Sequence, residues 1–185
     1  MKKAILVALF GIGVAFGADS IEVLIQKCEA GDGGKCVDAG FAYGTGDGVA
    51  KDASLAAKYY EKGCNLNNGY ACNNLAIAYR QGKGVAKNSS KAKELYIKAC
   101  DELNNPYACS GAGAEHFDDG RYLSAKKSWE KGCNSGKDYS CCSNLGVLYA
   151  SGRGVKTNYN TAKKYLKMAC DNGFKAACKN MRSIR

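Results

Sequence analysis

Apolar residues recur along this chain in short runs at helical spacing, and each run ends in a polar turn or a glycine loop. In residues 56–64 the apolar positions fall at i, i+3, i+4 and i+7, which is one face of a helix: Ala56, Tyr59, Tyr60 and Gly63. Residues 72–79 repeat this spacing, and a Gly-x-Gly-Val loop follows at residues 82–85. The pattern predicts an antiparallel pair of short helices closed by a glycine turn.

This helical hairpin returns about five times. Its first helix ends in a cysteine each time, at spacings of 36, 36, 33 and 37 residues: Cys28, Cys64, Cys100, Cys133 and Cys170. Self-similarity at this period is typical of a solenoid of helix pairs, so we expect an all-α fold. The expected units are residues 19–52, 53–88, 89–121, 122–158 and 159–185. Basic residues give the last unit the polar outer face of a terminal cap.

A second cysteine follows each first one after eight or nine residues, across the turn of the hairpin. The chain has 11 cysteines but one histidine and no Cys-x-x-Cys motif, which favours a disulfide framework over zinc. We therefore expect no metal and no cofactor. The predicted pairs are Cys28–Cys36, Cys64–Cys72, Cys100–Cys109, Cys133–Cys142 and Cys170–Cys178.

One cysteine is left over in the fourth unit. A step of eight residues would pair Cys133 with Cys141, whereas the downstream Cys-x-x-Leu pattern favours Cys142. We prefer Cys142, which leaves Cys141 as a free thiol. It could be reactive or cross-link two chains, or it could be an inert buried thiol.

The N-terminus has the features of a secretory signal peptide. Lys2 and Lys3 precede an apolar run over residues 4–16, and small residues follow it as a cleavage site. The run is shorter than the roughly 20 residues of a membrane-spanning helix. We therefore expect residues 1–18 to be removed, and the remaining chain to be exported to the periplasm or the exterior without membrane insertion.

Lysines are spread through every unit, and 25 basic residues face 17 acidic ones once residues 1–18 are removed. We interpret them as the solvated faces of amphipathic helices in preference to an attraction to acidic polymers. Base-stacking and groove-entering elements are missing from the sequence, so nucleic acid is not an expected partner.

The motif A-x-x-x-Y-x-K-x-C…C-x-x-L-x-x-x-Y-x-x-G-x-G-V, read over residues 56–85, resembles a Sel1-like repeat, a relative of the tetratricopeptide repeat. The added cysteine pairs resemble the secreted Helicobacter and Campylobacter cysteine-rich (Hcp) proteins. This resemblance implies a right-handed α/α superhelix with one disulfide per hairpin. It also implies protein partners or, as an alternative, penicillin binding with weak β-lactamase activity.

The residues themselves do not indicate β-lactam chemistry. Ser-x-x-Lys occurs at Ser90/Lys93 and Ser124/Lys127 without a Ser-Asp-Asn or Lys-Thr-Gly partner motif, so we interpret both matches as chance. His116 lies close to acidic residues and could serve as a base. We prefer a structural role for it, because it stands where other units have a packing tyrosine.

Solenoids bind partners in an extended groove lined by one helix of each repeat. The helices that begin at the second cysteines carry polar positions between their packing residues, and these could bind the backbone of an extended peptide. An equally weighted alternative is that they only face solvent. The candidate groove residues are Asp38, Asn73, Asn74, Ser110, Ser143 and Asn144.

Overall fold

The structure is a computed structural model that describes residues 19–136 and 138–184, so the predicted signal peptide lies outside the described residues. The described residues form ten α-helices and no strand, with a π-helical turn η1 (Lys98–Glu102) and a 3₁₀ turn η2 (Pro106–Ala108) in the third unit. The α-helices are α1 (Ile21–Glu29), α2 (Gly33–Thr45), α3 (Ala53–Asn65), α4 (Gly69–Gln81), α5 (Ser89–Ile97), α6 (Cys109–Asp118), α7 (Tyr122–Asn134), α8 (Tyr139–Ser151), α9 (Tyr159–Asp171) and α10 (Lys175–Ser183).

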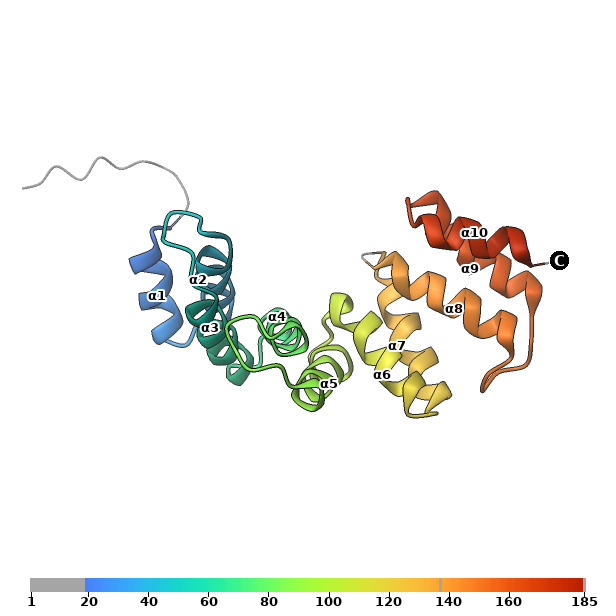
Figure 1. The fold of residues 1–185 in the computed structure, drawn as a ribbon, viewed down its shortest axis with the longest axis horizontal. Coiled ribbons are helices and arrows are strands. Elements are labelled where there is room, and N and C mark those ends of the chain that lie inside the picture. Colours follow the sequence, from blue (N-terminus) through green and yellow to red (C-terminus); the bar gives the residue numbers. More distant parts are fainter. Residues whose placement is uncertain (1–18, 137, 185) are drawn as a thin grey trace, which may run out of the picture.

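Each helix packs mainly on the helices before and after it in the chain, and the hairpins follow one another along a curved path (Figure 1). Even-numbered helices also contact each other across neighbouring units, as α2 does with α4 and α6 with α8. The all-α solenoid expected from the sequence is therefore confirmed.

Polar caps and glycine turns set the helix boundaries. The side chains of Asp52, Asn88 and Asn158 are N-caps that accept hydrogen bonds from backbone N–H groups in the first turns of α3, α5 and α9. Gly82 ends α4 in the left-handed conformation. The next glycine of the loop, Gly84, also has a positive φ and rests on the start of α3. A β-carbon there would lie 1.9 Å from the Ala53 carbonyl oxygen, so only glycine fits.

Neighbouring units pack by placing a large side chain on a small residue. The fourth residue after the second cysteine is Gly40 in α2, Gly113 in α6 and Gly146 in α8. A β-carbon at these glycines would lie 2.6 Å or less from the side chains of Tyr60, Trp129 and Leu166, respectively. The equivalent position in α10 is Arg182, which is exposed and larger than the glycines of the other units. This face of α10 is therefore polar.

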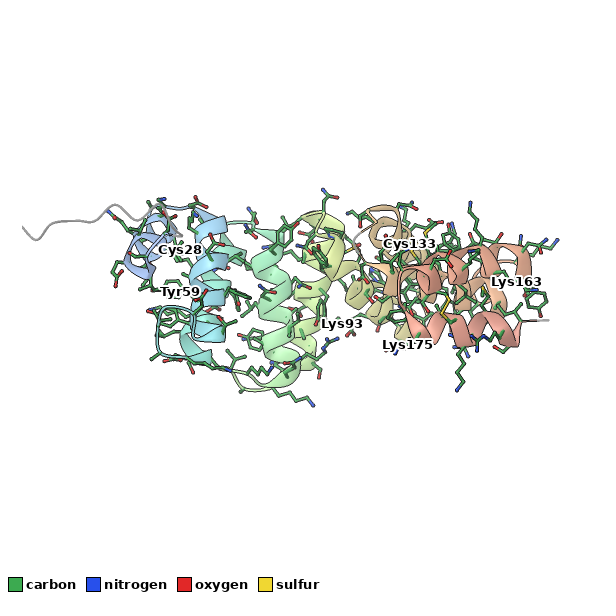
Figure 2. The ribbon with its side chains drawn as sticks, turned by 90° about the horizontal axis from the view of Figure 1, so that it is seen from above. Cys28, Tyr59, Lys93, Cys133, Lys163 and Lys175 are labelled. Atoms are coloured by element: carbon green, nitrogen blue, oxygen red, sulfur yellow. A yellow bond between two sulfur atoms is a disulfide. The ribbon has the colours of Figure 1, made fainter. Side chains whose placement is uncertain are left out.

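One disulfide joins the two helices of each of the five hairpins, with Cα–Cα distances of 4.5 to 4.9 Å. They are the yellow bonds in Figure 2. The fourth bridge is Cys133–Cys142, and Cys141 is a buried free cysteine.

The third unit departs from the others. Its turn holds one more residue than the turns of the first two units, since nine positions separate Cys100 from Cys109. The chain accommodates this turn with η1 and with η2, whose Pro106 lacks an amide hydrogen. The short loop to α7 replaces the Gly-x-Gly-Val loop.

Candidate binding groove

The candidate groove residues fall into two groups in the structure. Asn73 and Ser143 come directly after the second cysteine, are only 8% and 4% exposed, and are not available to a ligand. The next position along the helix is partly or fully open to solvent, as Asp38, Asn74 and Asn144 show. The candidate residues predicted from the sequence therefore belong to two helix positions, whose side chains point about 100° apart around the helix axis. Ser110, at the first of these positions, is partly buried.

A cavity of about 340 Å³ opens between α2, α3 and α4. Its apolar lining includes Phe41 from α2, Tyr60 from α3 and Ile77 from α4, and Asn74 also lines it. Phe41 is 56% exposed although it is a large apolar side chain. Open apolar surface bordered by a few polar groups is typical of a binding site.

A second cavity, of about 370 Å³, opens between α8, α9 and α10 at the other end of the array. It is lined by residues at the same repeat positions. Val147 corresponds to Phe41, Leu166 to Tyr60, and Asn180 to Asn74, when the cysteines are aligned. Both cavities therefore arise from the same repeat positions, one at the junction of the first two units and one at the junction of the last two.

We define the groove stripe as the second, fifth and ninth residues after each second cysteine. In most units the second and ninth positions are polar and the fifth is apolar, with Val147 still 44% exposed. The described members are Asp38, Phe41, Thr45, Asn74, Ile77, Gln81, Gly111, Ala114, Asp118, Asn144, Val147, Ser151, Asn180 and Ser183. Asp38, Asn74 and Asn144 from the sequence prediction belong to it, and the fifth position was missed because exposed apolar residues look like core residues in a sequence.

Comparison with known proteins assigns the family. The Sel1 repeat matches residues 36–68, 69–102 and 140–174, more than half of the chain. The chain belongs to the Sel1-repeat family. Comparison with curated proteins gave no match.

Solved structures agree with the Sel1 fold. The protein c5321, a protective antigen of uropathogenic Escherichia coli with an SLR fold, is 23% identical to this chain, with a TM-score of 0.78. The match covers 87% of this chain and 35% of the c5321 chain. A Sel1 repeat protein from Oxalobacter formigenes is 24% identical with a TM-score of 0.77 over 89% of this chain and 73% of its own. Cysteine-rich protein B of Helicobacter pylori is 38% identical over 48% of this chain and 66% of its own, with a TM-score of 0.46.

The Ser-x-x-Lys matches do not form a nucleophilic site in this Sel1 array. Lys93 binds both carboxylate oxygens of Asp119, at 2.6 and 2.7 Å, and Ser90 is exposed in the first turn of α5. Ser124 and Lys127 line an open polar pocket near Asp101. No hydrogen bond joins the serine to the lysine of either motif in the described chain. In neither motif does a hydrogen bond from the lysine activate the serine as a nucleophile.

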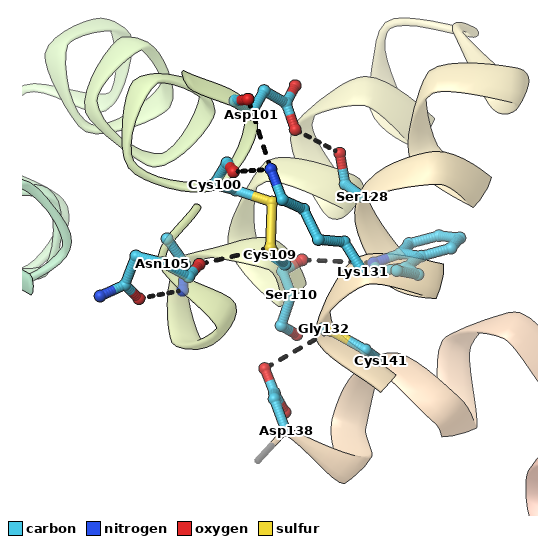
Figure 3. Close-up of a disulfide and its surroundings, with 12 residues drawn as sticks. Cys100, Asp101, Asn105, Cys109, Ser110, Ser128, Lys131, Gly132, Asp138 and Cys141 are labelled. Atoms are coloured by element: carbon cyan, nitrogen blue, oxygen red, sulfur yellow. Dashed lines mark hydrogen bonds between the residues drawn. A yellow bond between two sulfur atoms is a disulfide. The ribbon is translucent and has the colours of Figure 1, made fainter. Parts of the chain in front are cut away.

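His116 lies in the core of the third unit at 4% exposure. Its Nε2 is 3.0 Å from Asp101 Oδ2, and the Ser128 hydroxyl donates to Asp101 Oδ1 at 3.0 Å. Asp101 belongs to η1, so these bonds attach the irregular turn to α6 and α7. Lys131 adds bonds from its ammonium group to the carbonyl oxygens of Cys100 and Asp101 (Figure 3). This polar network holds the π-helical turn in place, which gives His116 a structural role.

Cys141 lies deep between the third and fourth units, beside Gly132 and Asp138 (Figure 3). A β-carbon on Gly132 would lie 2.4 Å from Cys141 Sγ, so the thiol fills the space that the glycine leaves. Burial, aided by the neighbouring Asp138 carboxylate, raises the pKa of the Cys141 thiol far above its ordinary value. The thiol is therefore an inert packing group in the folded state.

Within residues 19–136 and 138–184, no group of three His, Cys, Asp or Glu side chains is placed to hold a metal ion. The helices of that part of the chain are also too short or too polar to cross a bilayer.

Proposed function

We propose that this Sel1-repeat protein is an exported scaffold that binds an extended segment of a partner polypeptide in its groove. The observation that carries the proposal is the recurrence of one cavity, from the same repeat positions, at both ends of the array. A groove of this kind suits a chain that runs across the even-numbered helices.

The chemistry of the groove stripe fits an extended peptide. Asn74 and Asn180 offer amide groups that can bond both the N–H and the C=O of a peptide backbone. Phe41, Ile77 and Val147 offer apolar surface to side chains between those bonds. An extended peptide advances about 3.3 Å per residue and turns alternate side chains to one face, which matches alternating polar and apolar contacts.

The disulfides support the export part of the proposal. Five bridges in a chain of 185 residues would be reduced in most cytosols, and they persist in the periplasm or outside the cell. A secretory signal at residues 1–18 would deliver the chain to such a compartment.

The groove can be tested with residues 19–185, purified with their disulfides formed. A display library of random 12-residue peptides is selected on this protein, and the enriched peptides are titrated by fluorescence anisotropy. The double variant Phe41→Ser, Val147→Ser removes exposed apolar surface from both cavities without touching the core. Leu123→Ser is the matched control, because Leu123 is 68% exposed on α7 and outside the groove.

The proposal predicts that the double variant weakens peptide binding at least tenfold, whereas Leu123→Ser changes it less than twofold. Circular dichroism and urea unfolding establish that all three proteins are folded. Selection that enriches no peptide, or equal losses in the double variant and the control, would refute the groove.

A further inference from the structure

The net positive charge of the exported region is concentrated at one end of the chain. Residues 19–152 contain 16 basic and 16 acidic residues, whereas residues 153–185 contain nine basic residues and one acidic residue, Asp171. The two signs therefore balance over residues 19–152, and the excess of positive charge lies in residues 153–185.

The described basic residues of this end are all exposed. They lie on the loop before α9, on α9 and on α10, and we call them the basic end: Arg153, Lys156, Lys163, Lys164, Lys167, Lys175, Lys179 and Arg182. Within the described chain, the ion pair Lys167–Asp171 joins the single acidic residue to this set, at 2.6 Å. Lys175, Lys179 and Arg182 recur at i, i+4 and i+7, one face of α10.

Capping of the solenoid does not explain this charge. A terminal repeat needs a polar outer face, and mixed charges would provide one without repulsion. Like charges at this density destabilise the folded chain by mutual repulsion. Residues 19–152 carry equal numbers of both signs. A surface with this concentration of positive charge would attract an acidic partner.

We infer that the basic end is a docking surface for an acidic segment of the partner polypeptide. This inference takes the partner to be a polypeptide, and in that it rests on the proposed function. It adds a second binding surface and the requirement that the partner carry negative charge. The second cavity, lined by Val147 and Asn180, borders α10, so one peptide can occupy the groove and reach the basic end. Opposite charges would steer the partner toward this end and orient it along the groove.

The placement of the charges favours a flexible chain over a membrane. Lys163 and Lys175 lie well apart on the last hairpin (Figure 2), and the loop residues Arg153 and Lys156 precede α9. A flat lipid surface could reach one side of the hairpin at a time. A flexible acidic chain can follow the loop, α9 and α10 together.

The test compares two double charge reversals in residues 19–185. Lys175→Glu, Lys179→Glu alters the basic end, and Lys58→Glu, Lys87→Glu makes the same change in net charge in the balanced region. All four lysines are exposed. The probes are a labelled peptide of ten alternating Glu and Ser residues, the same peptide with Gln in place of Glu, and vesicles of phosphatidylglycerol and phosphatidylcholine.

We expect the Glu peptide to bind the unaltered protein at low salt, and the Gln peptide to bind at least tenfold more weakly. The basic-end variant should lose at least tenfold in affinity for the Glu peptide, and the control less than threefold. Equal losses in both variants would show a response to net charge alone and overturn the inference. Vesicle binding without Glu-peptide binding would also overturn it, in favour of a lipid surface.

Residues 19–52 contain seven acidic and three basic residues, so a second copy of the chain is the competing occupant. Salt-sensitive self-association in sedimentation, abolished by the basic-end variant, together with no Glu-peptide binding, would assign the surface to that copy and refute the inference. The two proposals fail separately. Selection that enriches no peptide, with the Glu peptide still bound by the unaltered protein and lost by the basic-end variant, would refute the groove alone. A selected peptide that binds the groove, without any Glu-peptide binding, would refute the basic end alone.

Discussion

The indole ring of Trp129 lies directly on Gly113, so that a β-carbon at Gly113 would be 2.2 Å from the indole nitrogen. This contact joins α6 of the irregular third unit to α7 of the fourth unit. We predict that Gly113→Ala destabilises the protein by about 1 to 3 kcal/mol, because the added methyl group overpacks a buried contact. Urea unfolding followed by the fluorescence of Trp129, the single tryptophan, measures the change.

Gly44→Ala is the matched substitution at an open position. A β-carbon at Gly44 would lie 3.7 Å from its nearest neighbours, which is ordinary contact. We predict that Gly44→Ala stabilises the protein by up to about 1 kcal/mol through helix propensity. Equal effects of the two substitutions would contradict the close-packing account of the solenoid.

Each disulfide should contribute measurably to stability. The bridge Cys64–Cys72 spans eight positions, and closing so small a loop reduces the entropy of the unfolded chain by an amount worth about 2.5 kcal/mol. We predict that Cys64→Ala, Cys72→Ala lowers the free energy of unfolding by at least that amount. An unchanged urea midpoint would show that packing alone holds the hairpin.

Cys141 should react only in the unfolded chain. Its burial and raised pKa predict almost no modification by a thiol reagent at pH 8 in the folded protein, and one thiol per chain in concentrated urea. Rapid modification without urea would contradict the placement of this thiol.

The variant Cys142→Ala tests which cysteine is bridged to Cys133. Two reactive thiols in this variant, Cys133 and Cys141, would show that Cys142 is the native disulfide partner of Cys133.

Asp119 should give the protein a small dependence on pH. Hydrogen bonds from Lys93, and then from Arg121, lower the pKa of Asp119 below its ordinary value of 3.8. The unfolded chain therefore binds this proton first as the pH falls, so the contribution is complete well above pH 4 and decreases below it. We predict that Asp119→Asn loses less stability than the unaltered protein between pH 6 and pH 3. Parallel losses would contradict a stabilising role for this carboxylate.

The repeat architecture could be predicted from the sequence because it depends on local signals. Cysteine pairs recur in every unit, Asn and Asp caps such as Asn88 begin several helices, and Gly-x-Gly-Val loops close the first, second and fourth units. The third unit was harder to predict. An additional residue between Cys100 and Cys109 can be absorbed in several ways, and the choice of a π-helical turn depends on tertiary bonds to Asp101.

The groove was only partly predictable for a related reason. Helical spacing shows that Asn73 and Asn74 lie on different faces, but it does not show which face the next repeat covers. That depends on how α4 meets its neighbours in space. The fifth position of the groove stripe was missed for a different reason. Phe41 is a large apolar residue of the kind found in a core, and only the structure shows that it is exposed.

Hydrogen–deuterium exchange with and without a selected peptide tests the groove most directly. The account predicts that the bound peptide slows amide exchange in α2 and α4, or in α8 and α10, the even-numbered helices that line the two cavities. Protection confined to α5 and α7, on odd-numbered helices outside the two cavities, would contradict it.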